Sequence, residues 1–550
     1  MATATVGVLL HATSDLAFGQ NAGQPTPADG PTYPGSDPAP GGALALGVIG
    51  EFDTANPYLV GLKSLSAEPL SGVMNGLIAY DSQQLLHPSL AESFEVDDDG
   101  LTYTFHLRAG VFFHNSDDFT ATDVIRSWEM IVNPAFPAAS RLGWERITSI
   151  DAPDPLTVIV KTDRIFAPFL STIAAAAFNC GSICSSRQLT SGPHAFAKLN
   201  KPIGTGPYQV TAWSQAEIVL DRFDRGWAGA PLLDRLTLRS YPDDDAQLAA
   251  LKSGDIQFTH RVGAPGASRV QAALAVPNAA VLSFTGNSWA HLDLKQIGFL
   301  QEQAVRQALD FVTPTDEIIA TILGGEAIRA SADQQPGSWA FQPALTPRVF
   351  DVQAAEKLLD ALELRPGADG IREKDGTPFV IELWGDQDDP HAEAVLTAIA
   401  ASWGRIGVQA SVNLNVASAL FGPDGYQFTA RMTAGYFRWS NYNDPDDRYY
   451  WNSAAIPSTP GAAGGNAPAF FHPYRFQAKI DDLTRRAALA TDQARRKALY
   501  WEIQNLLFDE VPVIFMFWDQ RFSAVSGNVG GYWPSSFTSL LWNCRDWWRV

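Results

Sequence analysis

Residues 436–451, YFRWSNYNDPDDRYYW, combine aromatic side chains with arginines and aspartates and follow neither a helical nor a strand period. Solvated loops rarely contain so many aromatic residues, and buried strands rarely contain so many charges. The wall of a ligand cleft uses both, because a ligand needs apolar contact area and a few fixed polar groups. We therefore expect this segment to line a binding cleft.

Motifs for catalysis are absent from the sequence. It contains no GxSxG elbow, no HExxH, no phosphate-binding loop and no dinucleotide fingerprint. The turn at 204–207, GTGP, is better explained as structural, and the acidic runs at 97–99, 243–245 and 388–389 lie in turn-like surroundings. His106 and His114 alone would make a weak metal site. We predict a binding protein without a catalytic set, a metal or a cofactor.

Composition excludes several partners. The 550 residues carry a net charge of −20, which disfavours nucleic acid and anionic membrane surfaces. No apolar run approaches the roughly 18 residues of a membrane span. The chain is too long for one core, so we expect two or more lobes. Cys180 and Cys184 are spaced for a local disulfide, although two unpaired thiols are the alternative.

The N-terminal region is expected to lie outside the fold. Residues 1–43 include a short apolar stretch without a preceding Lys or Arg, which makes a poor secretory signal, followed by a segment rich in Pro, Gly and Ala. We predict a flexible leader here, and whether it contains a complete signal peptide stays open.

From residue 44 onward, strand and helix patterns alternate. Residues 101–110 have the period of two of a half-buried strand, and Thr120 with Asp123 is typical of a helix N-terminus. Residues 377–385, the following helix and the strand VQASVNL form a strand–helix–strand unit, which favours parallel pairing. The apolar run 511–518 suits a fully buried strand. These patterns predict an α/β fold with mixed sheets.

Four blocks, in order along the chain, resemble the family 5 extracellular solute-binding proteins of ABC transporters, the peptide, dipeptide and nickel-binding group. They are LAESFEVDDDGLTYTFHLRAGVFFHNSDDFTATDVIRSWEMI (90–131), GTGPYQVTAW (204–213), DDDAQLAALKSGDIQ (243–257) and AVRQALDFVTPTDEIIATILGGEA (304–327). The first block is highly specific, and the resemblance covers about residues 44–545.

The resemblance implies a two-lobed periplasmic-binding-protein architecture with a hinge. The expected parts are lobe one at 44–283 with an inserted subdomain at about 71–200, lobe two at 284–520, and a return to lobe one at 521–550. It also implies a monomeric, periplasmic receptor that closes on its ligand and then docks on a membrane permease. No cysteine near the start is available for an N-terminal lipid anchor.

In peptide-binding members, the segment matching 439–445 has an aspartate that pairs with the ligand's α-ammonium group. Asn441 stands at that position here. An amide compensates a buried cation only weakly but suits hydroxyl or amide groups, and Arg438 adds a fork suited to a carboxylate or phosphate. The expected ligand is therefore a modified peptide, an opine-like or sugar-containing conjugate, or an oligosaccharide. If Asp444 or Asp446 supplies the missing charge instead, the ligand is an ordinary peptide.

Further ligand contacts are expected from aromatic side chains. Tyr436, Trp439 and Tyr442 are the first candidates, and Trp384 and Trp289 are the next, although the alternative for each is core packing. Three other functions compete with uptake of a peptide-like solute: binding of a metal chelate, hydrolysis on the same fold, and chaperone-like binding of extended chains.

Overall fold

The computed structural model describes residues 38–550, apart from 61–63, 175–180, 261–266, 432 and 463. Cys180 and almost all of the predicted leader therefore lie outside the described residues. The chain divides into two compact units. Unit 1 comprises Met1–Ala264, Ser268–Phe284 and Arg521–Val550, and unit 2 comprises Pro265–Ala267 and Thr285–Gln520.

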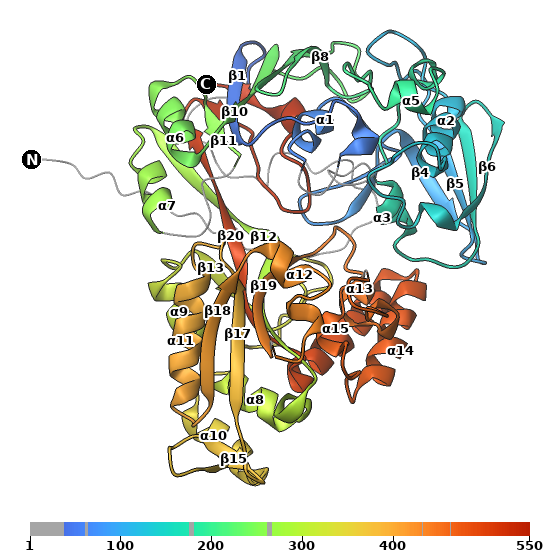
Figure 1. Ribbon diagram of the computed structural model, residues 1–550. Coiled ribbons are helices and arrows are strands. Elements are labelled where there is room, and N and C mark those ends of the chain that lie inside the picture. The colour runs from blue at the N-terminus through green and yellow to red at the C-terminus, as the bar shows by residue number, and fades with distance from the viewer. Residues whose placement is uncertain (1–37, 61–63, 175–180, 261–266, 432, 463) are drawn as a thin grey trace, which may run out of the picture. The chain divides into compact units, whose positions relative to one another are not determined.

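Unit 1 contains the N-terminal half of the chain and its C-terminal end (Figure 1). Its strands and helices are β1 (Ala43–Ile49), α1 (Ala67–Ser71), β2 (Ile78–Tyr80), β3 (Leu86–Pro88), β4 (Ala91–Val96), β5 (Thr102–Leu107), α2 (Ala121–Val132), β6 (Ile147–Asp154), β7 (Thr157–Thr162), α3 (Phe169–Ile173), α4 (Ser186–Leu189), α5 (Pro193–Phe196), β8 (Tyr208–Trp213), β9 (Glu217–Arg222), β10 (Arg235–Tyr241), α6 (Asp244–Ser253), β11 (Phe258–Thr259), α7 (Ala267–Leu274), β21 (Val529–Gly530) and β22 (Trp548–Arg549).

The described part of unit 1 contains two larger sheets and two short strand pairs, β2-β3 and β21-β22. In the first, β1 pairs in parallel with β10 and β11, and β10 continues antiparallel to β9 and then β8. In the second, four antiparallel strands follow the order β4-β5-β7-β6, and α2 packs on β6 and β7. Mixed sheets with short antiparallel ladders confirm the predicted α/β class for this unit.

The strongest sequence signals of unit 1 are confirmed. Strand β5 buries Tyr103, Phe105 and Leu107 on one face, as the period of two predicts. Helix α2 begins after Thr120 with a capping box, in which the backbone N–H of Thr120 donates to Asp123 Oδ2 at 2.9 Å. The signature block therefore folds as a sheet strand followed by a capped helix.

The GTGP turn is structural. A Cβ on Gly204 would come within 2.0 Å of the Val73 carbonyl oxygen, and one on Gly206 within 2.7 Å of the Gly72 oxygen. His114 holds the same turn, because its Nδ1 accepts from the Gly204 N–H and its Nε2 lies 3.0 Å from the Gly206 oxygen. Burial lowers the pKa of His114 to about 4. The two glycines thus allow a close backbone approach that no other residue permits.

Unit 2 contains the remaining strands and helices, and β12 and β20 continue from one unit into the other (Figure 1). Its elements are β12 (Ala279–Leu294), α8 (Gln303–Phe311), α9 (Thr315–Thr321), β13 (Ala327–Arg329), α10 (Val352–Ala361), β14 (Arg365–Pro366), β15 (Arg372–Lys374), β16 (Thr377–Pro378), β17 (Val380–Asp386), α11 (Ala392–Gly404), β18 (Gln409–Asn415), α12 (Ala417–Phe421), β19 (Ala434–Ser440), α13 (Arg448–Trp451), α14 (Gln477–Leu489), α15 (Gln493–Glu510) and β20 (Val513–Ser526).

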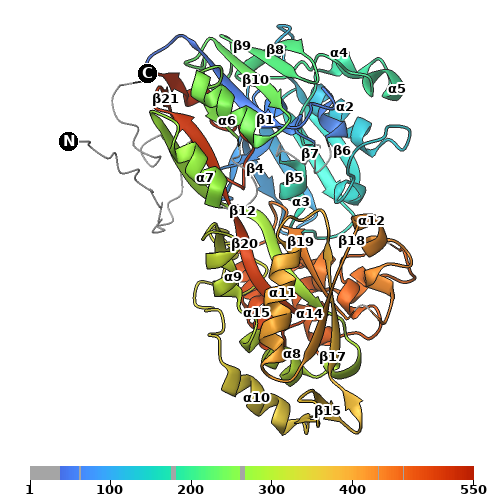
Figure 2. The ribbon, with the colours of Figure 1, turned by 60° about the vertical axis from the view of Figure 1, so that its left-hand side comes forward.

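The sheet of unit 2 positions the segment of interest. Strand β17 pairs in parallel with β18 on one side and with β19 on the other, and β19 runs antiparallel to β12. Helix α11 connects β17 to β18 and packs on both strands (Figure 2). The predicted strand–helix–strand unit is confirmed. Strand β20 is buried over residues 513–518, as its apolar run predicts.

Candidate ligand-binding site

Strand β19 carries the first part of segment 436–451 and fixes which side chains share a face. It pairs with β12 in a register that sets Trp439 opposite Trp289 and Tyr436 opposite Leu292. Because side chains alternate along a strand, Tyr436 and Arg438 lie on one face, and Phe437 and Trp439 on the other. After Ser440 a loop leads to the single-turn helix α13.

The tryptophans of this region form a packed aromatic cluster within unit 2. Trp439 stacks on Tyr450, with ring centroids 4.6 Å apart, and meets the ring of Trp289 edge to face at 5.3 Å. Trp289 is 0% exposed and also packs against Phe515 and Trp518 of β20. The structure thus assigns Trp289 a place in the core, which is the alternative weighed above. Tyr436 is likewise buried, on the opposite face.

Two tyrosines keep their rings accessible. Tyr442, in the loop, is 44% exposed, and Tyr449, in α13, is 54% exposed. Tyr449 was not singled out from the sequence, because nothing in the spacing of the neighbouring Tyr449 and Tyr450 tells which one turns inward. Exposed aromatic faces supply contact area at little entropic cost. These two rings are the accessible aromatic surfaces of the segment.

The side chain of Asn441 is occupied by neighbours in its own unit. Its Oδ1 accepts from Trp289 Nε1 at 3.0 Å, and its Nδ2 donates to the Asp333 carbonyl at 2.6 Å. Its backbone N–H donates to the Asn287 carbonyl at 2.8 Å. These neighbours offer a donor and an acceptor to the side chain, which an amide satisfies and a carboxylate does not.

Replacing Asn441 by aspartate should therefore destabilise the protein. One carboxylate oxygen can still accept from Trp289, but the other would face the Asp333 carbonyl oxygen, which is also an acceptor. Asn441 is only partly buried, and a typical hydrogen bond contributes about 0.5–1.5 kcal/mol, so the unfolding free energy in urea should fall by about that amount. As a control, Asn415→Asp keeps the acceptor that its side chain offers to the Val416 N–H and should change little. Equal stability of the two variants would contradict the hydrogen bonding described.

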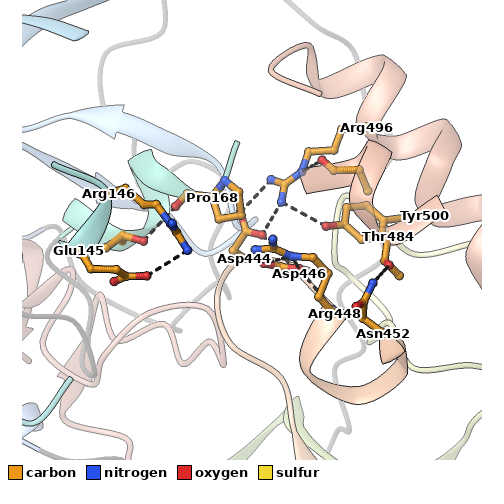
Figure 3. A network of polar contacts seen from close by, with 12 residues as sticks. Glu145, Arg146, Pro168, Asp444, Asp446, Arg448, Asn452, Thr484, Arg496 and Tyr500 are labelled. Carbon is orange, nitrogen blue, oxygen red and sulfur yellow. Dashed lines mark hydrogen bonds and ion pairs between the residues drawn. The ribbon is translucent and has the colours of Figure 1, made fainter. Parts of the chain in front are cut away.

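The aspartates of the loop are paired with arginines. Asp444 receives two hydrogen bonds from Arg496 of α15, at 2.5 and 2.8 Å, and Arg496 also donates to the Tyr500 hydroxyl (Figure 3). Asp446 is bonded by Arg448, with Nη2 to Oδ2 at 2.6 Å. Asp444 and Asp446 are therefore each paired with an arginine. This pairing argues against Asp444 or Asp446 as a substitute for the missing ammonium-binding aspartate.

Arg438 is compensated in the same manner. Its guanidinium contacts Asp389, from the segment after β17, and its Nε lies 3.3 Å from Asp519 of β20. The sequence suggested a positive fork for an anionic ligand group, but two carboxylates surround this arginine, so the cluster has an excess of negative charge. The role of Arg438 as a fork for a carboxylate or phosphate stays a prediction, and such a ligand group would have to compete with these two carboxylates.

Trp384 at the end of β17 is half-buried. Its Nε1 donates to Glu382 at 3.3 Å, and its ring packs against a small cluster of Leu420, Tyr426 and Phe437. A ligand contact through its accessible part stays a prediction.

Two carboxylates were missed by the sequence analysis. Asp333 and Asp447 are 1% and 2% exposed. Burial raises the pKa of Asp333 to about 6. The pKa of Asp447 lies well above its usual range because of burial, and the charges of Asp333 and Asp446 raise it further. The only signal in the sequence was the acidic run at 446–447, which resembles an ordinary solvated turn.

The described part of the chain lacks a cluster suited to a metal ion. No group of three His, Cys, Asp or Glu side chains in the described part could hold a metal ion. Cys184 and Cys544 are buried free thiols, and burial raises the pKa of Cys184 to about 12, which disfavours its thiolate form at neutral pH. No helix in the described ranges is long and apolar enough to cross a membrane.

Comparison with known proteins decides the family. Residues 86–458, more than half of the chain, match the bacterial extracellular solute-binding proteins, family 5 Middle. The chain belongs to this family. The resemblance inferred from the sequence blocks is thus confirmed, and so is a function in solute binding.

Two curated relatives of this family 5 protein span nearly its whole length. Glutathione-binding protein GsiB of Escherichia coli O6:K15:H31 (strain 536 / UPEC) is 27% identical over 521 residues, covering 92% of this chain and 94% of GsiB. Oligopeptide-binding protein AppA of Bacillus subtilis (strain 168) is 25% identical over 524 residues, covering 93% of this chain and 92% of AppA. Both are binding proteins by name.

Solved structures share the fold. AppA of Bacillus subtilis in complex with a nonapeptide superposes with a TM-score of 0.69 at 24% identity, covering 94% of this chain and 100% of AppA. NikA from Brucella suis in complex with Fe(III)-EDTA gives a TM-score of 0.77 at 22% identity, covering 92% of this chain and 100% of NikA. These similarities confirm the periplasmic-binding-protein class of fold for this chain.

Proposed function

We propose that this family 5 protein captures a peptide-like or conjugated small solute and delivers it to the membrane permease of an ABC importer. Relatives named for glutathione and oligopeptide binding support the peptide-like class. The observation that carries the proposal is the internal pairing of segment 436–451. Its accessible groups are the rings of Tyr442 and Tyr449, whereas Asp444 and Asp446 are held by arginines.

Capture works through closure about a hinge. Strands β12 and β20 run from one unit into the other and could serve as the hinge. A ligand that binds the closed state better than the open state shifts the population toward closure. A permease that binds the closed form then interacts mainly with receptor molecules that carry a ligand. A protein with this role acts outside the inner membrane, in the periplasm, as a monomer.

Position 441 narrows the ligand class. Because Asn441 is neutral and its side chain is hydrogen-bonded within unit 2, it provides no carboxylate for an α-ammonium group. We therefore propose that a free amino terminus contributes little to affinity. A sugar-containing or opine-like conjugate, or an oligosaccharide, is the second candidate, since hydroxyl groups and sugar faces also suit exposed tyrosines.

Thermal shift and calorimetry with matched peptides test this proposal. The probes are one peptide with a free and with an acetylated amino terminus, oxidised and reduced glutathione, and an opine-type conjugate. A ligand at about 100 times its dissociation constant stabilises by about 2.7 kcal/mol. The proposal expects acetylation to change the affinity less than threefold. A loss of a hundredfold on acetylation would show that a carboxylate elsewhere binds the ammonium group.

Tyr442→Ala and Tyr449→Ala should weaken binding without unfolding the protein. Removing an exposed aromatic face that stacks on ligand should lower the affinity about 5- to 50-fold, corresponding to about 1–2.3 kcal/mol, while the melting temperature of the free protein stays nearly constant. Leu142→Ala is a suitable control, because Leu142 is an exposed apolar residue of unit 1 outside the segment. Unchanged affinity in both tyrosine variants would remove these rings from the site.

A further inference from the structure

The buried carboxylates Asp333 and Asp447 lie at two loops that are joined in the interior of unit 2. Asp333 follows β13, and Asp447 directly precedes α13. Gln334 Nε2 donates to the Pro445 carbonyl at 3.3 Å, and Asn441 Nδ2 donates to the Asp333 carbonyl. These bonds tie the loop of Asp333 to the segment that is proposed to face the ligand.

Trp451 connects the two acids. Its Nε1 donates to Asp333 Oδ2 at 2.6 Å, and its backbone N–H donates to the Asp447 carbonyl at 3.2 Å. Asp333 Oδ1 and both carboxylate oxygens of Asp447 have no hydrogen-bond partner among the described residues. Three buried carboxylate oxygens are thus left without a donor, which is costly for ionised groups.

The surrounding charges do not compensate the pair. Asp446 and Arg496 act on Asp447, and the hydroxyl groups of Tyr450 and Tyr500 also lie within electrostatic reach of the two acids. Arg496 is engaged in the bidentate bond to Asp444, and Asp446 is paired with Arg448. Among the described residues that act on Asp447, the positive charge is therefore the one already paired with Asp444.

We infer that Asp333 and Asp447 form a proton-binding site, which holds at least one proton at neutral pH between the loop after β13 and segment 441–451. Two buried carboxylates without a cation cannot both remain ionised at an acceptable cost, and a proton is the smallest ligand that removes one charge and supplies a donor. This inference goes beyond solute binding and does not depend on the identity of the solute.

The site makes stability depend on pH in a defined direction. The pKa of Asp333 rises on folding from its ordinary value of 3.8 to about 6. The folded state then binds more protons than the unfolded state between these values, so the unfolding free energy falls as pH rises through this window. In the folded state the pKa of Asp447 lies well above its usual range, so the unfolding free energy continues to fall as the pH rises beyond the pKa of Asp333. Loss of the proton would loosen the loop that holds Asn441.

Asp447→Asn tests the inference, with Asp333→Asn as a second variant and the exposed Asp424→Asn as the matched control. The melting temperature of the wild type should fall between pH 5 and pH 8. Asp447→Asn should flatten this slope and melt a few degrees above the wild type at pH 8, whereas Asp424→Asn should keep the wild-type profile. A wild-type slope in both interior variants would overturn the inference.

Infrared spectroscopy of the wild type tests the inference without depending on whether a substituted protein folds. A protonated carboxyl band should persist at pH 7 and should weaken in Asp447→Asn. Absence of that band at pH 7 in the wild type would overturn the inference. If added Ca²⁺ or Na⁺ raised the melting temperature of the wild type but not of Asp447→Asn, the site would bind a metal ion and the proton assignment would be wrong.

Discussion

Arg496→Met should destabilise the protein by about 3–5 kcal/mol, because removal of one partner from a buried ion pair leaves the other charge uncompensated. Arg496 and Asp444 are both at least nine-tenths buried, and the guanidinium also donates to the Ala487 carbonyl and the Tyr500 hydroxyl. Methionine retains most of the side-chain volume, so the effect reports the lost charge. Urea unfolding followed by tryptophan fluorescence measures it.

The matched control is Arg485→Met. Arg485 pairs with Asp482 on the exposed side of α14, where both side chains are largely solvated. Exposed pairs contribute about 0–1 kcal/mol, so this variant should unfold close to the wild type. In addition, the double variant Arg496→Met/Asp444→Asn should recover part of the loss, since it removes both charges of this ion pair. If Arg496→Met were as mild as the control, Asp444 would not depend on this arginine.

Trp289→Ala is expected to have a comparably large effect on stability. The indole is 0% exposed, is surrounded by aromatic rings from β19, α13 and β20, and donates its Nε1 hydrogen to Asn441. Truncating a buried aromatic residue costs about 3–5 kcal/mol, from lost transfer energy and the cavity left behind. The unfolding free energy of the ligand-free protein measures this cost.

Comparing Trp289→Ala with Tyr442→Ala separates packing from ligand contact. The tryptophan variant should lose stability in the absence of ligand, and the tyrosine variant should lose affinity at nearly constant stability. A Trp289→Ala protein with wild-type stability and strongly reduced affinity would contradict its assignment to the core and would support the contact first considered from the sequence.

Local signals predicted the elements of the fold well. The alternation in residues 101–110 specifies one buried face whatever the rest of the chain does, and the capping box of Thr120 and Asp123 lies within four residues. The apolar run of β20 likewise needs no distant partner to indicate burial. Such features depend on the period of the backbone and on short spacings, which a sequence displays directly.

The charges of the site could not be predicted in the same way. Asp444 is neutralised by Arg496, which lies 52 positions later, and Asn441 is bonded to Asp333, 108 positions earlier. Arg438 contacts Asp389, which precedes it in the sequence by 49 positions, and Asp519, which follows it by 81 positions. A sequence gives the residue types in a loop but not these tertiary partners, and the partners decide whether a charge is available to a ligand.

Burial also separated side chains that look equivalent in the sequence. Tyr449 and Tyr450 are neighbours of identical chemistry, yet the first is exposed and the second is stacked on Trp439. Asp446 and Asp447 differ likewise, because one is paired with Arg448 and the other is enclosed without a donor among the described residues. Tyr449 and Tyr450 lie in the single-turn helix α13, and the two aspartates immediately precede it, so the local backbone path sets which member of each pair is buried.

The most direct test of the account is native mass spectrometry of the purified protein, followed by denaturation and identification of the released molecule. A receptor of this kind should retain its solute through purification, since saturating ligand stabilises the folded state. The account predicts one or a few masses of peptide-like or sugar-conjugated compounds, bound one per monomer. Free-amine oligopeptides of many lengths as the sole bound species would contradict the ligand class proposed from Asn441. A protein that purifies empty and is stabilised by none of the probes would contradict the proposed capture of a peptide-like solute.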